Sequence, residues 1–164
     1  MDFQIPLLVS ALAFFAFLVF RVVPWGGQGE RGAPKEARAA LARAEEAKSD
    51  ADRALALADA GEASAKVLGR GGSSAALFLR AMKSDPCSVE IVNRAATALG
   101  RKRRSLEHLL WRRLAQEPFR RETRDANMAA LSALAKLYEN SPPKLRLRGA
   151  AIEHMLSALR NTAE

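Results

Sequence analysis

The placement of alanine restricts the fold of this 164-residue chain more than any other feature. Thirteen of the 31 residues from 35 to 65 are alanine, and one series is separated by steps of three and four: Ala37, Ala40, Ala44, Ala47, Ala51, Ala54 and Ala58. This spacing is typical of one helix face, and alanine is the strongest helix former. The face either packs closely on a partner helix or reflects chance in an alanine-rich stretch. We favour an ordinary helical hairpin broken near Ser49, where Asp52 completes a capping pattern.

Glycine and proline divide the rest of the chain into short segments. Apolar residues recur with helical period over five ranges: 73–83, 89–99, 105–115, 124–139 and 144–159. Turn-forming residues separate them, among them Pro86, Gly100 and Pro118. No stretch of alternating β-branched residues is present, so the sequence predicts an all-α fold. Because alanine is abundant and only ten residues are aromatic, we expect thin helices in close contact and no bulky core.

The segment before Pro86 resembles the second half of a tetratricopeptide repeat, a unit of two antiparallel helices and about 34 residues. Gly69 stands in the turn between the helices, and Phe78 and Ala81 follow at the spacing of the second helix. Asp85 and Pro86 then close the unit.

A second unit covers residues 87–118, a length of 32, and keeps the turn glycine and the closing proline. In this second unit, Arg112 and Arg113 stand where the repeat has a small residue. In the first unit, Ala58, Gly61 and Glu62 stand where the family has a Trp-like residue and a Leu-Gly pair. The resemblance covers residues 50–118 and weakens beyond them. It implies a short TPR-like solenoid of stacked antiparallel helix pairs, with a concave protein-binding surface and no catalytic group. An unrelated helical bundle is the alternative.

The N-terminal part of the chain is strongly apolar. Residues 5–20 carry no charge, which predicts a transmembrane helix over 5–23 with Arg21 and Trp25 at the membrane interface. Residues 1–4 then form a tail, 24–33 a flexible linker and 34–164 the helical domain. A cleaved signal peptide would need basic residues before the apolar run and a cleavage site after it, and neither is present. A buried helix is the third interpretation.

The charges that flank this run predict its orientation. The abundance of alanine and arginine indicates a GC-rich bacterial genome, so the expected membrane is a bacterial inner membrane. Asp2 precedes the run, whereas Arg21, Arg31, Lys35 and Arg38 follow it. Basic flanks stay in the cytoplasm, so a cytoplasmic domain is favoured over a periplasmic one.

Basic residues concentrate in residues 101–124, where nine stand against three acidic ones. They are Arg101, Lys102, Arg103, Arg104, Arg112, Arg113, Arg120, Arg121 and Arg124. We place the first four in a turn between helices and expect Arg112 and Arg113 on the polar side of the next helix. This basic cluster is either a solvated face or a site for an acidic protein, anionic lipid or nucleic acid. The scarcity of aromatic residues argues against nucleic acid.

No arrangement of residues indicates catalysis, a metal or a cofactor. His108 and His154 have no ligand pattern nearby, and Cys87, the single cysteine, has no histidine partner in sequence. The glycines of residues 69–72 follow no strand and precede no Lys-Ser pair, so they indicate a turn and no phosphate loop.

The sequence therefore predicts a non-enzymatic adaptor or scaffold, held in a membrane by a single-pass anchor. It would bind a protein partner, of acidic character if the basic cluster takes part. The alternative is an electrostatic tether that binds anionic lipid or nucleic acid through residues 101–124. The sequence predicts no oligomeric state.

Overall fold

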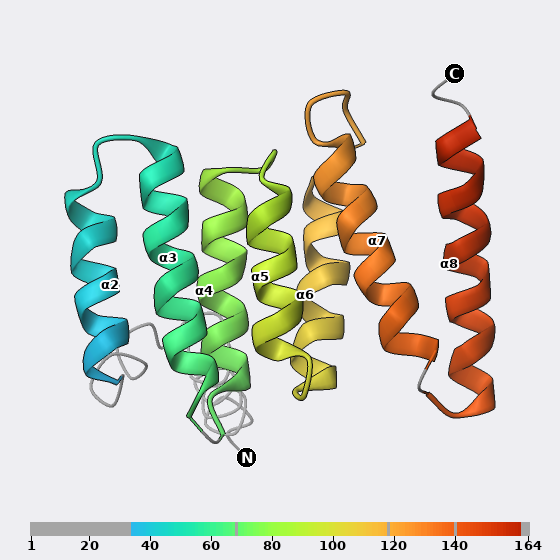
Figure 1. Cartoon of the computed structure of the whole chain (residues 1–164), viewed down its shortest axis with the longest axis horizontal. Helices are drawn as coiled ribbons and strands as arrows, with labels where there is room; N and C mark the ends of the chain where they lie inside the picture. Colours follow the sequence, from blue (N-terminus) through green and yellow to red (C-terminus); the bar gives the residue numbers. More distant parts are fainter. Residues whose placement is uncertain (1–33, 68, 118, 140, 162–164) are drawn as a thin grey trace, which may run out of the picture. The chain divides into compact units, whose positions relative to one another are not determined.

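The computed structural model describes residues 34–67, 69–117, 119–139 and 141–161, and within these ranges every regular element is an α-helix. There are seven: α2 (Lys35–Glu46), α3 (Asp50–Ala65), α4 (Gly71–Ser84), α5 (Val89–Leu99), α6 (Arg103–Gln116), α7 (Arg124–Glu139) and α8 (Pro143–Asn161) (Figure 1). The predicted all-α content is confirmed for the part of the chain that the structure describes.

Local capping explains where several helices begin. The Oγ of Ser49 accepts a hydrogen bond from the backbone N–H of Asp52 at 3.0 Å and so starts α3, as the sequence predicts. Ser88 starts α5 in the same way, by accepting from Ile91 at 3.3 Å. Between α3 and α4 the chain reverses at Gly69, whose φ of 78° favours glycine.

Two helices begin two residues earlier than the apolar pattern indicates. Helix α4 begins at Gly71 and α6 at Arg103. Before α6, the N–H of Lys102 donates to the carbonyl of Leu99 at 2.7 Å, so the turn after Gly100 is tight. Arg103 and Arg104 therefore belong to a helix, and their expected place in the turn is wrong.

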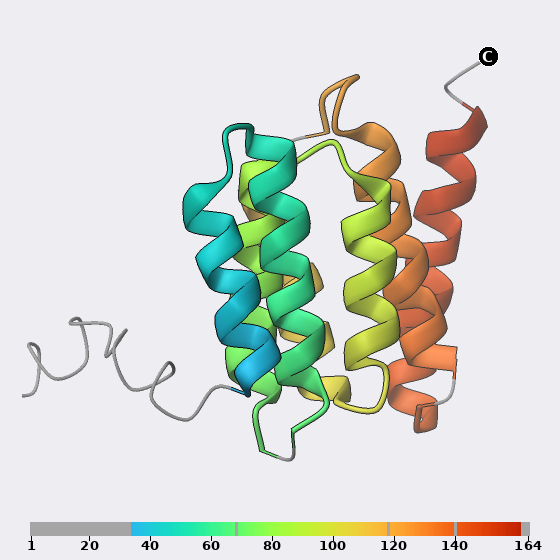
Figure 2. The same cartoon turned by 60° about the vertical axis from the view of Figure 1, so that its left-hand side comes forward.

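Each helix packs on near neighbours in the sequence. Successive helices from α2 to α8 contact one another, and further contacts join α3 to α5, α5 to α7 and α4 to α6 (Figures 1 and 2). We call α3, α5 and α7 the A rank, and α4 and α6 the B rank. Helix α8 contacts only α7 among the described helices. This arrangement agrees with helix pairs that bury their apolar faces by stacking.

Small residues bring the first helices close together. Ala40 of α2 and Ala54 and Ala58 of α3 are buried, and α2 packs on α3. On α3, a Cβ at Gly61 would lie 3.0 Å from the ring of Phe78, which is fully buried. The remaining interior is mainly aliphatic and includes Met82, Ile91, Leu99, Leu109, Leu110, Leu131 and Leu134.

The predicted fold class is wrong in its membrane component. Among the described residues, no helix has the length and apolar character needed to cross a bilayer. The longest, α8, has 19 residues and is interrupted by charged ones such as Arg146, Arg148 and Glu153, whereas a span needs about 20 predominantly apolar residues. The predicted span at 5–23 lies outside the described residues, as do Arg21 and Trp25.

A polar network joins α6 to α7 through Tyr138, whose side chain is buried. Its hydroxyl donates to Oε1 of Glu107 at 2.6 Å and accepts from Nε1 of Trp111 at 3.0 Å. Burial, reinforced by the hydrogen bond to Glu107, raises the pKa of Tyr138 above its usual value near 10. The folded state therefore holds the neutral phenol.

We expect this network to stabilise the protein only while Tyr138 is protonated. The contribution is complete below the unfolded-state pKa of about 10 and is lost as the pH rises through the higher folded-state pKa. Urea unfolding from neutral to strongly alkaline pH should show a smaller alkaline loss of stability in Tyr138→Phe than in the wild type. Equal losses in the two proteins would contradict the raised pKa of Tyr138 as the source of the alkaline loss.

Candidate functional site

Three members of the basic cluster are used inside the fold, at the carboxyl ends of other helices. The Nζ of Lys102 donates to the carbonyls of Ala65 and Val67, at 2.6 and 2.9 Å, where α3 ends. The last carbonyls of a helix lack partners within it and carry the negative end of the helix dipole, so a cation there is stabilising.

Arg103 and Arg124 act in the same way on α7 and α8. The Nη2 of Arg103 donates to the carbonyl of Leu137 at 2.5 Å and also to Ser141. The Nη2 of Arg124 donates to the carbonyl of Leu159. Lys102 and Arg103 therefore hold the start of α6 against the ends of α3 and α7, and Arg124 holds the start of α7 against the end of α8.

Arg113 lies in the interior, so its expected position on the polar side of α6 is wrong. Its side chain is only 1% exposed, and Nη2 donates to the carbonyl of Pro86 at 2.6 Å. Its Nε and Nη1 atoms have no hydrogen-bond partner among the described residues. Burial lowers the pKa of Arg113, partly offset by Glu117, so the folded protein carries the cost of a poorly solvated charge.

Replacing Arg113 with methionine is expected to raise the free energy of unfolding by about 1 kcal/mol. The methionine fills most of the space, and the unfavourable burial of a charge disappears. Chemical denaturation measures the change, and Arg112→Met, at an exposed neighbour, serves as the matched control. A loss of stability in Arg113→Met larger than in the control would show that the bond to Pro86 outweighs the cost of burial.

The exposed members of the basic cluster do not form one patch. Arg101 and Arg104 lie at the start of α6, whereas Arg120 and Arg121 lie beyond its end. A helix of 14 residues separates the two groups, a rise of roughly 20 Å. Arg112 lies between them on α6. The sequence suggests one basic surface, whereas the structure divides its exposed members between the two ends and the middle of α6.

A groove of about 610 Å³ lies between α5 and α7 of the A rank. Its polar lining comes from Asn93 and Thr97 on α5 and from Ser132 and Lys136 on α7. Arg103 of α6 lies at one end. The apolar lining is Ala96, Leu106, Ala129, Ala133 and Leu137.

Two further hollows adjoin this α5–α7 groove along α7. One of about 360 Å³ lies between α7 and α8 and is lined by Ser132, Lys136, Glu153 and other residues. Another of about 430 Å³ includes Val89 of α5 and Arg124 of α7. Ser132 lines all three, so the three hollows are neighbours along α7.

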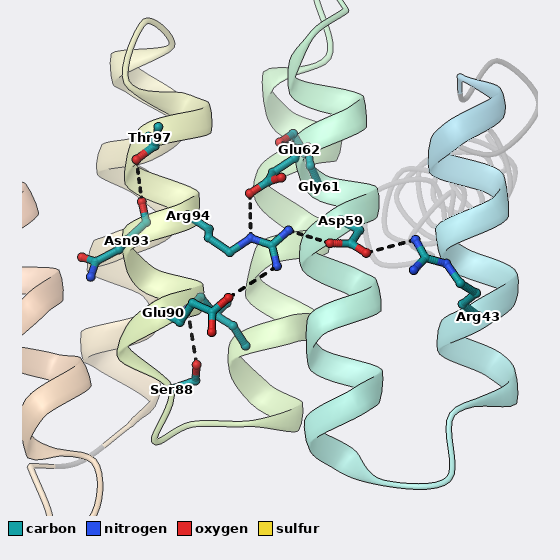
Figure 3. Close-up of polar contacts among 11 residues, drawn as sticks. Arg43, Asp59, Gly61, Glu62, Ser88, Glu90, Asn93, Arg94 and Thr97 are labelled. Atoms are coloured by element: carbon teal, nitrogen blue, oxygen red, sulfur yellow. Dashed lines mark hydrogen bonds and ion pairs between the residues drawn. The ribbon is translucent and has the colours of Figure 1, made fainter.

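An ion-pair network fixes α5, one wall of the groove, against α3 (Figure 3). The Nη2 of Arg94 lies 2.6 Å from Oδ1 of Asp59, and its Nε lies 2.7 Å from Oε1 of Glu62. The same Asp59 carboxylate also bonds Arg43 of α2 at 3.0 Å, and Glu90 lies 3.9 Å from Arg94. The hydrogen bond to Glu62 is the largest of the effects that raise the pKa of Arg94.

Sequence reasoning missed the groove residues, although a signal was present. Asn93 with Thr97, and Ser132 with Lys136, are polar pairs four residues apart within alanine-rich helices. Each pair therefore lies on one helix face. What the sequence did not reveal is that the two faces border the same groove.

The described residues include no group of three or more His, Cys, Asp or Glu side chains that could hold a metal ion. Cys87, His108 and His154 are exposed and lie on three different segments, the turn before α5, helix α6 and helix α8.

The α5–α7 groove offers hydrogen-bonding groups, cations and apolar surface. These are the contacts through which protein interfaces bind a peptide.

Comparisons of this chain with protein-family models, with curated proteins and with solved structures find no match.

Proposed function

We propose that this protein is a non-enzymatic adaptor with a TPR-like stack of helix pairs, and that it binds an extended segment of a partner protein along α7. The observation that carries the proposal is the meeting of three hollows at Ser132. A segment lying there would contact α5 and α8 as well as α7. Polar and apolar side chains line the groove together, which suits the alternating contacts of an extended peptide.

The charges of the α5–α7 groove favour an acidic partner segment. Its lining contains Arg103 and Lys136 and no acidic side chain. Arg103 is occupied at the end of α7, whereas Lys136 is exposed. Lys136 is therefore the side chain that would meet a carboxylate of the partner, and Ser132 supplies a hydrogen bond beside it.

A displayed library of random peptides tests this proposal with the full-length protein. Peptides selected on the protein should be rich in Asp and Glu. Fluorescence anisotropy should show that Lys136→Glu weakens them about tenfold and that Ser132→Gln, which narrows the groove without adding a charge, also weakens them about tenfold. The control is Lys83→Glu, the same reversal at an exposed position of α4 outside the groove.

Equal losses from Lys136→Glu and Lys83→Glu would mean that binding depends only on net charge, and the proposal would fail. It would also fail if the selected peptides carried no excess of acidic residues. The predicted location at an inner membrane depends on residues 5–23, which lie outside the described residues, and it stays a prediction.

The tether that binds lipid or nucleic acid is less well supported. Lys102, Arg103, Arg113 and Arg124 are bound to backbone carbonyls of the same chain. Salt separates the two functions, because binding through many phosphate contacts weakens steeply with ionic strength, whereas a groove that combines one lysine contact with hydrogen bonds and apolar contacts should lose much less affinity.

A further inference from the structure

A second groove, of about 390 Å³, lies between α4 and α6 of the B rank. It shares no lining residue with the α5–α7 groove. Its floor is apolar and includes Ala75, Leu79 and Leu109, which are buried or half-buried. The function proposed above makes no use of it.

A row of cationic and polar side chains borders this α4–α6 groove on one side. Arg104, His108 and Arg112 are exposed residues of α6 placed four residues apart. They therefore follow one helix face over about 12 Å. No acidic residue is among those that line the groove.

The other border is formed by small residues of α4, Gly72 and Ala76. A Cβ placed on Gly72 would meet no atom within 4 Å, so the space beside it is open. At the adjacent Gly71, a Cβ would lie 2.7 Å from Oγ of Ser105, which shows that α4 and α6 touch there. The two helices thus meet at one position and leave a hollow beside the next.

We propose that the α4–α6 groove binds an acidic amphipathic helix of a partner protein. The low border at Gly72 and Ala76 allows a helix to approach closely, and its apolar stripe would cover Ala75, Leu79 and Leu109. Carboxylates at every fourth position of that helix repeat at the spacing of the row on α6. A lipid headgroup would engage the cations and leave the apolar floor uncovered, so the helix accounts for more of the groove.

The test measures fluorescence anisotropy of a labelled synthetic helix with the full-length protein. The probe has roughly 18 residues, or about 27 Å, with Glu at every fourth position beside a stripe of Leu and Ala. A second probe carries Gln in place of each Glu. We expect the Glu probe to bind at least about tenfold more tightly than the Gln probe.

Two variants separate charge from shape. The double variant Arg104→Glu, Arg112→Glu should weaken the Glu probe about tenfold or more. The control Lys35→Glu, Lys48→Glu makes an equal charge change at the first residue of α2 and in the connection after it, and should leave binding within about twofold. Gly72→Gln adds an uncharged side chain at the border of the groove, where a Cβ meets no atom within 4 Å, and should also weaken the probe about tenfold.

Three results would overturn the proposal. The first is equal binding of the Glu and Gln probes, and the second is equal loss in the two double variants. The third uses vesicles of phosphatidylcholine and phosphatidylserine in equal parts. The proposal fails if the wild type and Gly72→Gln bind these vesicles, the Arg104→Glu, Arg112→Glu variant does not, and the Glu probe binds none of the three proteins. The row on α6 would then serve a lipid surface.

Discussion

Replacing Phe78 with alanine is expected to lower the free energy of unfolding by about 3–5 kcal/mol. Phe78 is fully buried, and its ring lies against Gly61, where the absence of a side chain lets α3 and α4 approach closely. Alanine would leave a cavity that these helices can hardly close, because Ser74 also ties them together by donating to the carbonyl of Gly61 at 2.7 Å.

Urea unfolding followed by far-ultraviolet circular dichroism measures this loss. The matched control is Leu147→Ala on α8, another large apolar side chain, which is 74% exposed and should change stability by less than about 0.5 kcal/mol. If Phe78→Ala cost no more than Leu147→Ala, the close approach of α3 and α4 would not be the centre of the core.

Replacing Arg94 with methionine is expected to destabilise the protein by about 2 kcal/mol. The change keeps the apolar stem and removes a guanidinium that is bonded to Asp59 and Glu62. These two carboxylates of α3 would then repel each other without a shared cation. Because both are more than a third exposed, solvent limits the loss to well below that of a fully buried pair.

Arg53→Met provides the matched control, since the exposed Asp50 is the one carboxylate that pairs with Arg53 in the part of the chain that the structure describes. It should cost less than about 0.5 kcal/mol. The difference between the two variants should shrink in high salt, where screening weakens the ion pairs. Equal costs would indicate that the network does not hold α5 against α3, and that the position of the groove wall depends on apolar packing instead.

Local signals made most of the helix bounds predictable. Ser49 and Ser88 cap the helices that follow them, and Gly69 and Pro86 mark turns, so neighbouring residues suffice to place α3 and α5. The hydrogen-bond partner of a basic side chain, in contrast, cannot be predicted from its neighbours in the sequence. Lys102 finds its carbonyl partners at Ala65 and Val67, more than thirty residues earlier in the chain.

The same reasoning explains what was missed at the candidate site. The sequence places Arg113 on the polar side of α6, but its guanidinium is buried and donates to the carbonyl of Pro86. Asn93 and Ser132 are ordinary polar residues of alanine-rich helices until the contact between α5 and α7 brings them to one groove. Helix pattern fixes which face a residue occupies, and tertiary packing decides what that face meets.

The near-neighbour packing of the helices also bears on how quickly the chain folds. Every contact between described helices joins elements that are adjacent in sequence or separated by one other helix. Only short loops must close to form such contacts, so little chain entropy is lost before they are gained. Low contact order of this kind is associated with folding in microseconds to milliseconds, and in a stack of similar units it allows folding to start at more than one helix pair.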